Sequence, residues 1–149
     1  MFLRLHRINH WLWSRKVPFV PWFIKVFFRI VFGVVLPPSV KVGRGVIISY
    51  QGLGTVIHKE AAIGDRAVIS SCVTLGGRSG LKGAPVIEEG ALIGSGAKVL
   101  GPVTVGKWAS VGANAVVLSD VPAFAVVVGV PARVVKYNSL EDLPDYANF

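Results

Sequence analysis

From Ile57 to Val117, the hydrophobic pattern of the chain repeats with a period of six residues. Each hexad begins with Ile, Leu or Val. Gly often follows, and the fifth residue is usually small, as in IGDRAV (63–68) and VGANAV (111–116). This period matches neither the roughly 3.6-residue period of an α-helix nor the two-residue alternation of long strands. It is typical of a coil with three short flat faces, in which one aliphatic residue per face points to the axis. The pattern therefore predicts an all-β fold, a parallel β-helix, over residues 40–136.

Two stretches depart from this repeat. SYQGLGT (49–55) carries a three-residue excess between the inward positions Ile48 and Ile57. GGRSGLKGAP (76–85) keeps the count, but its Gly and Pro content predicts a loop that leaves the coil, so Leu81 does not have to point inward. Because the repeat itself only builds the core, we expect functional groups near these departures.

Residues 1–39 differ in character from the repeat and predict two helices. The apolar face of the first helix is expected to comprise Met1, Leu5, Ile8 and Leu12. A second helix is expected to begin near Pro21, because proline is favoured in the first turn of a helix. The paired prolines in VLPPS (35–39) then predict a linker to the solenoid.

The second helical stretch, PWFIKVFFRIVFGVVL (21–36), is apolar apart from Lys25 and Arg29. Two charges in so short a span argue against a transmembrane helix, which needs roughly 20 nearly uncharged residues. No small-residue cleavage site of a signal peptide follows the apolar run. Aromatic residues mixed with cations instead predict that residues 1–36 contact a membrane surface. The alternative is that this face packs on the solenoid or on a neighbouring subunit.

The net charge of +8 is concentrated in the first half of the chain, where Glu60 is the first acidic residue. This charge favours an anionic partner, and the mean hydropathy of +0.60 favours a membrane over nucleic acid. The coils offer no stacking platform for bases, so we expect no nucleic-acid partner. The single Cys72 excludes an internal disulfide and is expected to be a buried thiol, which suits a reducing compartment.

These observations predict a cytoplasmic protein that is peripheral on the cytoplasmic face of the inner membrane. Its expected parts are an N-terminal helical segment (1–39), the β-helix domain (40–136) and a polar tail (137–149) that forms a short helix or is loosely held.

Three stretches of the chain resemble a known family. They are VTLGGRSG (73–80), the hexads of 86–122, and VVGVPARVV (127–135), and they are similar to the hexapeptide-repeat acyltransferases, in particular the serine acetyltransferase-like branch. The resemblance implies a homotrimer of left-handed parallel β-helices with active sites between adjacent subunits. It also implies acetyl-CoA as the acyl donor and a hydroxyl as the acceptor. The fold alone would not establish this chemistry, because one fold hosts many functions.

Transfer of an acetyl group to a hydroxyl needs a base, and histidine is suited to that role near neutral pH. The chain has three histidines, of which His6 and His10 lie in the amphipathic segment and are expected to be interfacial. His58 follows the inward Ile57 and should face outward, where it is either simply solvated or, as the resemblance favours, the catalytic base. Glu60 is a candidate to orient it. Backbone N–H groups of Gly76 or Gly77 are candidates to stabilise the oxyanion.

The chain also departs from the family pattern. Serine acetyltransferases carry a histidine in an Asp-His-Ala-Thr-Gly stretch where this chain has Ser49-Tyr50-Gln51-Gly52, and a second before a proline where it has Ala84-Pro85. With both histidines missing, we expect Tyr50 and Gln51 to contact an acceptor other than free serine. The basic N-terminal segment favours a lipid- or nucleotide-linked saccharide, as in the similar O-acetyltransferases of surface-polysaccharide biosynthesis. The alternatives are a serine O-acetyltransferase and a catalytically inactive trimeric membrane scaffold.

Cofactor contacts follow from the resemblance residue by residue. Small residues whose backbone would line the pantetheine groove are Gly77, Ser95 and Ala113. Arg133 and Lys136 resemble the cations near the 3′-phosphate of CoA, and Arg78 and Lys82 are candidates to bind a phosphorylated acceptor. Each of these residues also has a purely structural explanation, either coil packing or a solvated charge.

Two further expectations concern metals and assembly. A metal enzyme on this solenoid would need three convergent histidines, and the repeat contains one, so no metal is predicted. Trp108 faces outward by register and is a candidate for the trimer interface.

Overall fold

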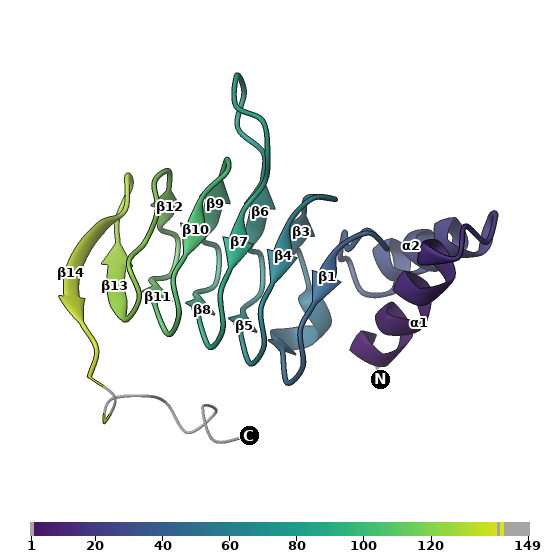
Figure 1. Ribbon diagram of the computed structural model, residues 1–149, viewed down its shortest axis with the longest axis horizontal. Helices are drawn as coiled ribbons and strands as arrows, with labels where there is room; N and C mark the ends of the chain where they lie inside the picture. The colour runs from purple at the N-terminus through teal and green to yellow at the C-terminus, as the bar shows by residue number, and fades with distance from the viewer. Residues whose placement is uncertain (1, 140, 142–149) are drawn as a thin grey trace.

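The computed structural model describes residues 2–139 and 141, and in them the chain winds into a triangular solenoid of three parallel sheets. Figure 1 shows the coils stacked from a helical hairpin at one end to β13 and β14 at the other. The predicted parallel β-helix is therefore confirmed. Of the predicted tail, 137–149, the structure describes 137–139 and 141, of which Tyr137 ends the last strand; the rest lies outside the described residues.

Each sheet takes one short strand from each coil. Sheet 1 contains β1 (Lys41–Val42), β4 (Ala62–Ile63), β7 (Val86–Ile87) and β10 (Thr104–Val105). Sheet 2 contains β2 (Ile47–Ile48), β5 (Val68–Ile69), β8 (Leu92–Ile93), β11 (Ser110–Val111) and β13 (Ala125–Val128), with β14 (Arg133–Tyr137) pairing antiparallel to β13. Sheet 3 contains β3 (Val56–Ile57), β6 (Thr74–Gly76), β9 (Lys98–Leu100) and β12 (Val116–Val117).

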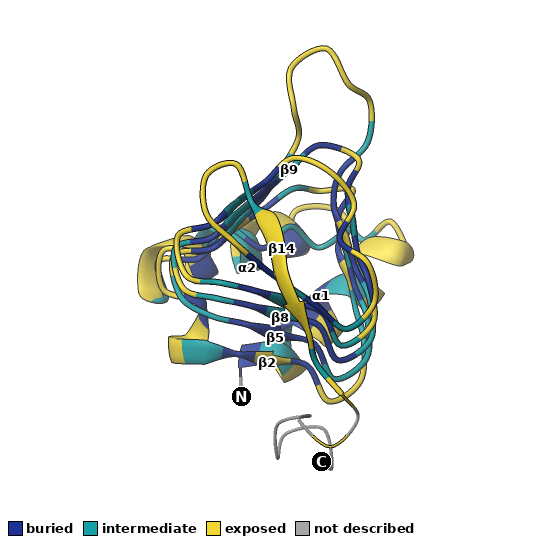
Figure 2. Ribbon diagram, turned by 90° about the vertical axis from the view of Figure 1, so that its left-hand side faces the viewer, coloured by how far each residue is buried: buried dark blue, intermediate teal, exposed yellow. Residues whose placement is uncertain are grey.

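The hexad register predicts the core correctly. Of its eleven first positions, all except Leu81 are buried, and the small fifth positions Ala67, Ala91, Ala97, Ala109 and Ala115 have no exposed surface. In Figure 2 the buried stretches lie along the flat faces of the coils, and exposed stretches lie at turns and loops. Stacked aliphatic columns of this kind remove apolar surface from water along the whole axis, which stabilises the solenoid.

Both departures from the repeat have a structural counterpart. Residues 49–52 form a kinked turn, η1 (Ser49–Gly52), in which Tyr50 and Gln51 leave helical geometry with positive φ angles of 50° and 56°. Residues 77–85 form a loop that projects from the solenoid between β6 and β7 (Figure 1). Leu81 in this loop is 51% exposed, and Leu75 and Ile87 occupy consecutive inward positions. The loop is thus one whole hexad that has left the coil, which explains why the count was preserved.

Two helices cover the first coil. They are α1 (Phe2–Ser14) and α2 (Val20–Val31), and the second begins next to Pro21, as predicted. Phe2 and Phe28 pack on each other, with ring centroids 4.8 Å apart, and are buried against Val34 and Leu36. The hairpin therefore closes the end of the core.

The predicted apolar face of α1 is correct only in part: Leu5 packs against the core, Ile8 does not, and Met1 lies outside the described residues. The buried residues of α1 are Phe2, His6 and Asn9, whereas Ile8 is 54% exposed. Two histidines of α1 bond to backbone carbonyls of the chain entering the first coil: a ring nitrogen of His6 donates to Val40 O, and one of His10 donates to Pro38 O. The buried amide of Asn9 has no hydrogen-bond partner within the described residues. Burial lowers the pKa of His6 below its ordinary value. Neither helix in the described part of the chain is long and apolar enough to cross a membrane.

Candidate active site

One edge of the solenoid, where sheet 3 passes to sheet 1, carries an open pocket of about 570 Å³. We call this the open edge; it comprises residues 37–41, which lead into the first coil, and the turns at 58–61 and 77–85. Its pocket gathers five of the predicted site residues, namely His58, Glu60, Gly77, Arg78 and Lys82. They come from turns of successive coils, so the stacking of the coils, not proximity in sequence, brings them together.

His58 lies half-buried in this pocket because Ile57 points into the core and the next residue points out. Its Nδ1 accepts a hydrogen bond of 3.2 Å from the backbone N–H of Glu60. The contact that orients the ring thus comes from the backbone of Glu60 and not from its carboxylate. A side-chain carbon added at Gly77 would lie 3.9 Å from Cδ2 and Nε2 of His58, so the Nε2 side of the ring faces the 77–85 loop.

The first turn of that loop supplies a donor and a cation. Leu81 N–H donates to Arg78 O, and Arg78 Nη1 donates to Leu118 O over 3.4 Å, which ties the loop to a later coil. Gly77 N–H makes no hydrogen bond within the described residues, so it is free to donate to a ligand beside His58. A free N–H group next to an imidazole fits the needs of acyl transfer.

Other predicted residues lie at a different edge, where sheet 2 passes to sheet 3. Tyr50 and Gln51 are exposed there in η1. Ser95 and Ala113 are exposed on adjacent coils, joined by the hydrogen bond from Asn114 N–H to Ser95 O. Within one protomer, sheet 3 separates all four from the pocket at the open edge.

The two predicted phosphate contacts lie at the C-terminal end of the solenoid. Arg133 and Lys136 are exposed on β14, and within the described residues Arg133 Nη1 donates to the carbonyl of Ala132 alone. Both guanidinium and ammonium groups are therefore available to a ligand, but one protomer does not bring them to His58.

Sequence reasoning missed several lysines near the pocket. Lys59 lines it directly, and Lys41 and Lys25 line an adjoining hollow. The signal for Lys59 was its place in the same outward turn as His58. Nothing in the local sequence connected Lys25 with this turn, because it is brought there by the packing of the hairpin.

The structure overturns one further expectation and leaves the place of Trp108 in the trimer interface a prediction. Cys72 is exposed, so the prediction of a buried thiol is wrong; it stands at a corner with a positive φ of 58° instead of an inward position. Trp108 packs on its own chain: its ring lies over Gly90 of the preceding coil, and the Arg66 guanidinium lies 5.3 Å from the ring centroid. In residues 2–139 and 141, no group of three His, Cys, Asp or Glu side chains is placed to hold a metal ion.

Comparison with known proteins matches this geometry to one family. Residues 84–119 match the model of the bacterial transferase hexapeptide family (six repeats). A serine acetyltransferase from Bacillus licheniformis is 43% identical over 150 residues, which cover 94% of this chain and 69% of that protein.

Solved structures give the same result. A serine acetyltransferase in complex with CoA superposes with a TM-score of 0.83 at 36% identity, covering 90% of this chain and 55% of that one. The Neisseria gonorrhoeae serine acetyltransferase in complex with serine also gives 0.83, at 37% identity and with coverages of 89% and 54%. This chain thus spans a little over half the length of these solved relatives.

These findings correct the predicted acceptor. The relatives are named serine acetyltransferases, so the expectation of a saccharide acceptor and of a role in surface-polysaccharide biosynthesis is wrong, and the alternative of serine is the better supported. The inference failed because it gave the missing histidines and the basic N-terminal segment more weight than the matching coils. The predicted left-handed parallel β-helix is confirmed. The relatives belong to the predicted class of acetyltransferases, and one of them is solved in complex with CoA. The chain belongs to the serine acetyltransferase family of bacterial hexapeptide-repeat transferases.

Proposed function

We propose that this protein transfers an acetyl group from acetyl-CoA to the hydroxyl of serine in the pocket at the open edge. The observation that carries the proposal is the 43% identity to a serine acetyltransferase over a stretch that includes the whole pocket. In the reaction, the hydroxyl oxygen forms a bond to the thioester carbon and the carbon–sulfur bond breaks. The hydroxyl proton ends on the sulfur of CoA.

His58 is the residue that we assign to this proton transfer, because it is the only histidine outside α1. While Glu60 N–H donates to Nδ1, the neutral ring carries its hydrogen on Nε2. To accept the serine proton at Nε2, the ring must move its hydrogen to Nδ1 and release the Glu60 bond. We therefore propose that acceptor binding displaces this bond, and that Gly77 N–H stabilises the developing oxyanion.

The charges of the pocket fit a zwitterionic acceptor. Arg78 and Lys82 are available to its carboxylate, and the Glu60 carboxylate to its ammonium group. Tyr50 and Gln51, and the CoA contacts proposed for Ser95, Ala113, Arg133 and Lys136, lie on other surfaces of the protomer. A homotrimer that packs the edge between sheets 2 and 3 of one subunit against the open edge of the next would unite them.

The test is an assay of thiol release from acetyl-CoA with L-serine, L-threonine and no acceptor, with mass spectrometry of the product. We expect release that depends on serine and a product heavier by one acetyl group. Release no faster than without an acceptor, while acetyl-CoA still binds, would favour the inactive scaffold instead. Light scattering tests the trimer, and a monomer would remove the proposed assembly of the site.

We also propose that the hairpin contacts the cytoplasmic face of the inner membrane. Its support is a set of exposed aromatic side chains, among them Phe19 (77% exposed) and Trp22 (56%), beside exposed Arg15 and Lys16. Cosedimentation with anionic and with neutral vesicles tests this proposal. We expect binding to the anionic vesicles only, and protein that stays in the supernatant with both would contradict it.

A further inference from the structure

The open edge carries a second hollow beside the transfer pocket. This hollow, of about 780 Å³, lies between the helical hairpin and the first two coils. Its walls include Trp13 of α1, Lys25 of α2 and residues 37–41, and it shares Lys59 and Glu60 with the transfer pocket. The two hollows are therefore neighbours that meet at these two side chains.

A third hollow extends the same path. It measures about 280 Å³ and shares Trp13, Lys25 and Pro38 with the second. Its far end is formed by Phe19 and Trp22, at the exposed aromatic end of the hairpin. Together the three hollows make one groove from the hairpin to His58, which we call the acceptor groove.

The middle of the acceptor groove is cationic. Lys25, Lys41 and Lys59 line it, and none of them has an ion-pair partner within the described residues, while Glu60 is the one acid on its walls. Unpaired ammonium groups around a concave surface attract an anion. The far end is aromatic and apolar, with Trp13, Phe19 and Trp22 available to an apolar substituent.

The walls of the groove are held in place by hydrogen bonds. Ser39 Oγ donates to Lys59 O at 2.7 Å, which ties the first coil to the turn that carries His58. His10 bonds Pro38 O at 2.7 Å, which ties α1 to the same wall. A preformed groove loses little conformational entropy on binding, which is the property expected of a ligand site.

We propose that the acceptor groove binds an acyl acceptor larger than free serine, an amphiphilic anion with a free hydroxyl, of which an N-acylated serine is the simplest. Its hydroxyl lies at His58 and its apolar chain over Trp13 toward Phe19. Its carboxylate lies among Lys59, Lys41 and Lys25, in place of the contact with Arg78 and Lys82 that we propose for free serine. The bond changes are those of the proposed function, on which this inference rests: the acceptor oxygen replaces sulfur on the acetyl carbon, and the proton passes to CoA.

The experiment uses the full chain with L-serine and N-octanoyl-L-serine, the latter below its micellar concentration. Calorimetry measures binding of each compound, and thiol release from acetyl-CoA measures turnover. We expect N-octanoyl-serine to bind at least about tenfold more tightly than serine, about 1.4 kcal/mol, because burying only a few methylene groups supplies that much.

Two variants and a matched control locate the binding. Trp13→Ala and Lys25→Gln should each weaken the binding of N-octanoyl-serine by about tenfold and leave the KM for serine unchanged. Lys16→Gln, which removes an exposed cation of the hairpin outside the groove, should change neither value. Thermal unfolding of each variant shows that the hairpin remains folded.

The outcomes separate this inference from the proposed function. The proposed groove is wrong if N-octanoyl-serine binds no more tightly than serine, or if it binds Trp13→Ala and the parent equally. Either result holds even if serine is acetylated. Tight binding that depends on Trp13 and Lys25, without acetylation of any acceptor, overturns the proposed function and leaves the groove standing.

Discussion

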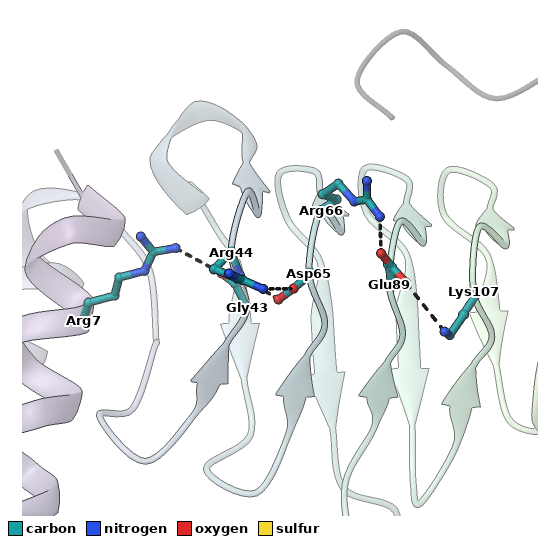
Figure 3. Close-up of polar contacts among 7 residues, drawn as sticks. All are labelled: Arg7, Gly43, Arg44, Asp65, Arg66, Glu89 and Lys107. Carbon is teal, nitrogen blue, oxygen red and sulfur yellow. Dashed lines mark hydrogen bonds and ion pairs between the residues drawn. The ribbon is translucent and has the colours of Figure 1, made fainter. Parts of the chain in front are cut away.

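Two edges of the same solenoid use their charged residues in opposite ways. At the edge where sheet 1 passes to sheet 2, which we call the closed edge (turns 43–46, 64–67, 88–91 and 106–109), the charges form ion pairs between coils (Figure 3). Arg44 pairs with Asp65, and Glu89 receives both Arg66 and Lys107. At the open edge, Lys41, Lys59 and Lys82 have no ion-pair partner within residues 2–139 and 141.

The difference indicates that charged residues at the closed edge stabilise the solenoid, whereas those at the open edge remain available to a ligand. The Arg66 hydrogen bond, together with nearby Lys107, lowers the pKa of the Glu89 carboxyl, as expected for an acid within a ladder of cations. Helix α1 reaches both edges, because His10 bonds Pro38 O at one and Arg7 donates to Gly43 O at the other (Figure 3). The hairpin thus forms one wall of the groove at the open edge. At the closed edge it adds Arg7 to the row of contacts between coils, which we call the ladder.

The largest expected effect is loss of activity at the open edge. His58→Ala should lower the rate of thiol release from acetyl-CoA by about 10²–10⁴-fold, the usual contribution of a general base. Steady-state kinetics with serine measures this. Lys107→Gln, at the closed edge, is the control and should retain the parent rate. Equal rates in His58→Ala and the parent would remove His58 from its proposed role.

The second effect concerns stability at the closed edge. Gly90 has a φ of +67°, and the ring of Trp108 occupies the space where a side chain would begin. Gly90→Ala should therefore lower the free energy of unfolding by about 3 kcal/mol, from backbone strain together with displacement of the ring. Gly80 in the 77–85 loop has a φ of +81° and nothing within 4 Å of an added carbon, so Gly80→Ala should cost only about 1 kcal/mol.

Denaturant titration measures both glycine variants. Equal losses would mean that Trp108 yields without cost and that the closed edge is not tightly packed.

This contrast also explains how far the sequence could be interpreted. The inward column followed from the hexads, because burial depends on local register, and Leu81 could be recognised as an outlier from its Gly-rich surroundings. The ladder could not be predicted, since Arg44–Asp65 and Arg66–Glu89 join residues one coil apart. The η1 turn and the 77–85 loop change the number of residues per coil. Which residues lie one coil apart therefore became clear only from the structure. The groove was hidden for a similar reason, because the sequence does not show that α1 and α2 pack beside Lys59.

A smaller effect on stability measures how much the ion pairs of the closed edge contribute. Arg66→Ala removes the hydrogen bond to Glu89 and the cation above Trp108, and should destabilise the protein by about 1 kcal/mol. Arg44→Ala is the matched control, because its side chain is 93% exposed and its 3.7 Å ion pair with Asp65 should contribute little. Denaturation midpoints at low and high salt measure both, and the Arg66 effect should shrink at high salt. Identical midpoints for the two variants would show that the coils do not depend on the ladder.

The smallest effect lies beneath α1, between the two edges. The His6 ring is 1% exposed and donates through Nε2 to Val40 O, while its Nδ1 has no hydrogen-bond partner within the described residues. Burial is the main cause of its lowered pKa, and the neighbouring His10 and Arg7 lower it further. The unfolded chain, whose histidines titrate near pH 6.5, therefore binds a proton more readily than the folded chain. Stability should be fully present above that pH and fall as the pH drops below it.

The size of the effect is expected to be below about 1 kcal/mol between pH 7.5 and pH 5.5, and it is measured by thermal unfolding at both values. His6→Gln removes the titrating ring and should flatten this dependence. His10→Gln, on the same helix but only partly buried, should reduce it only slightly, because burial and not His10 is the main cause of the lowered pKa of His6. If the two variants keep the same slope as the parent, the proton is taken up elsewhere. The packing of α1 against the chain that enters the first coil would then be insensitive to acid.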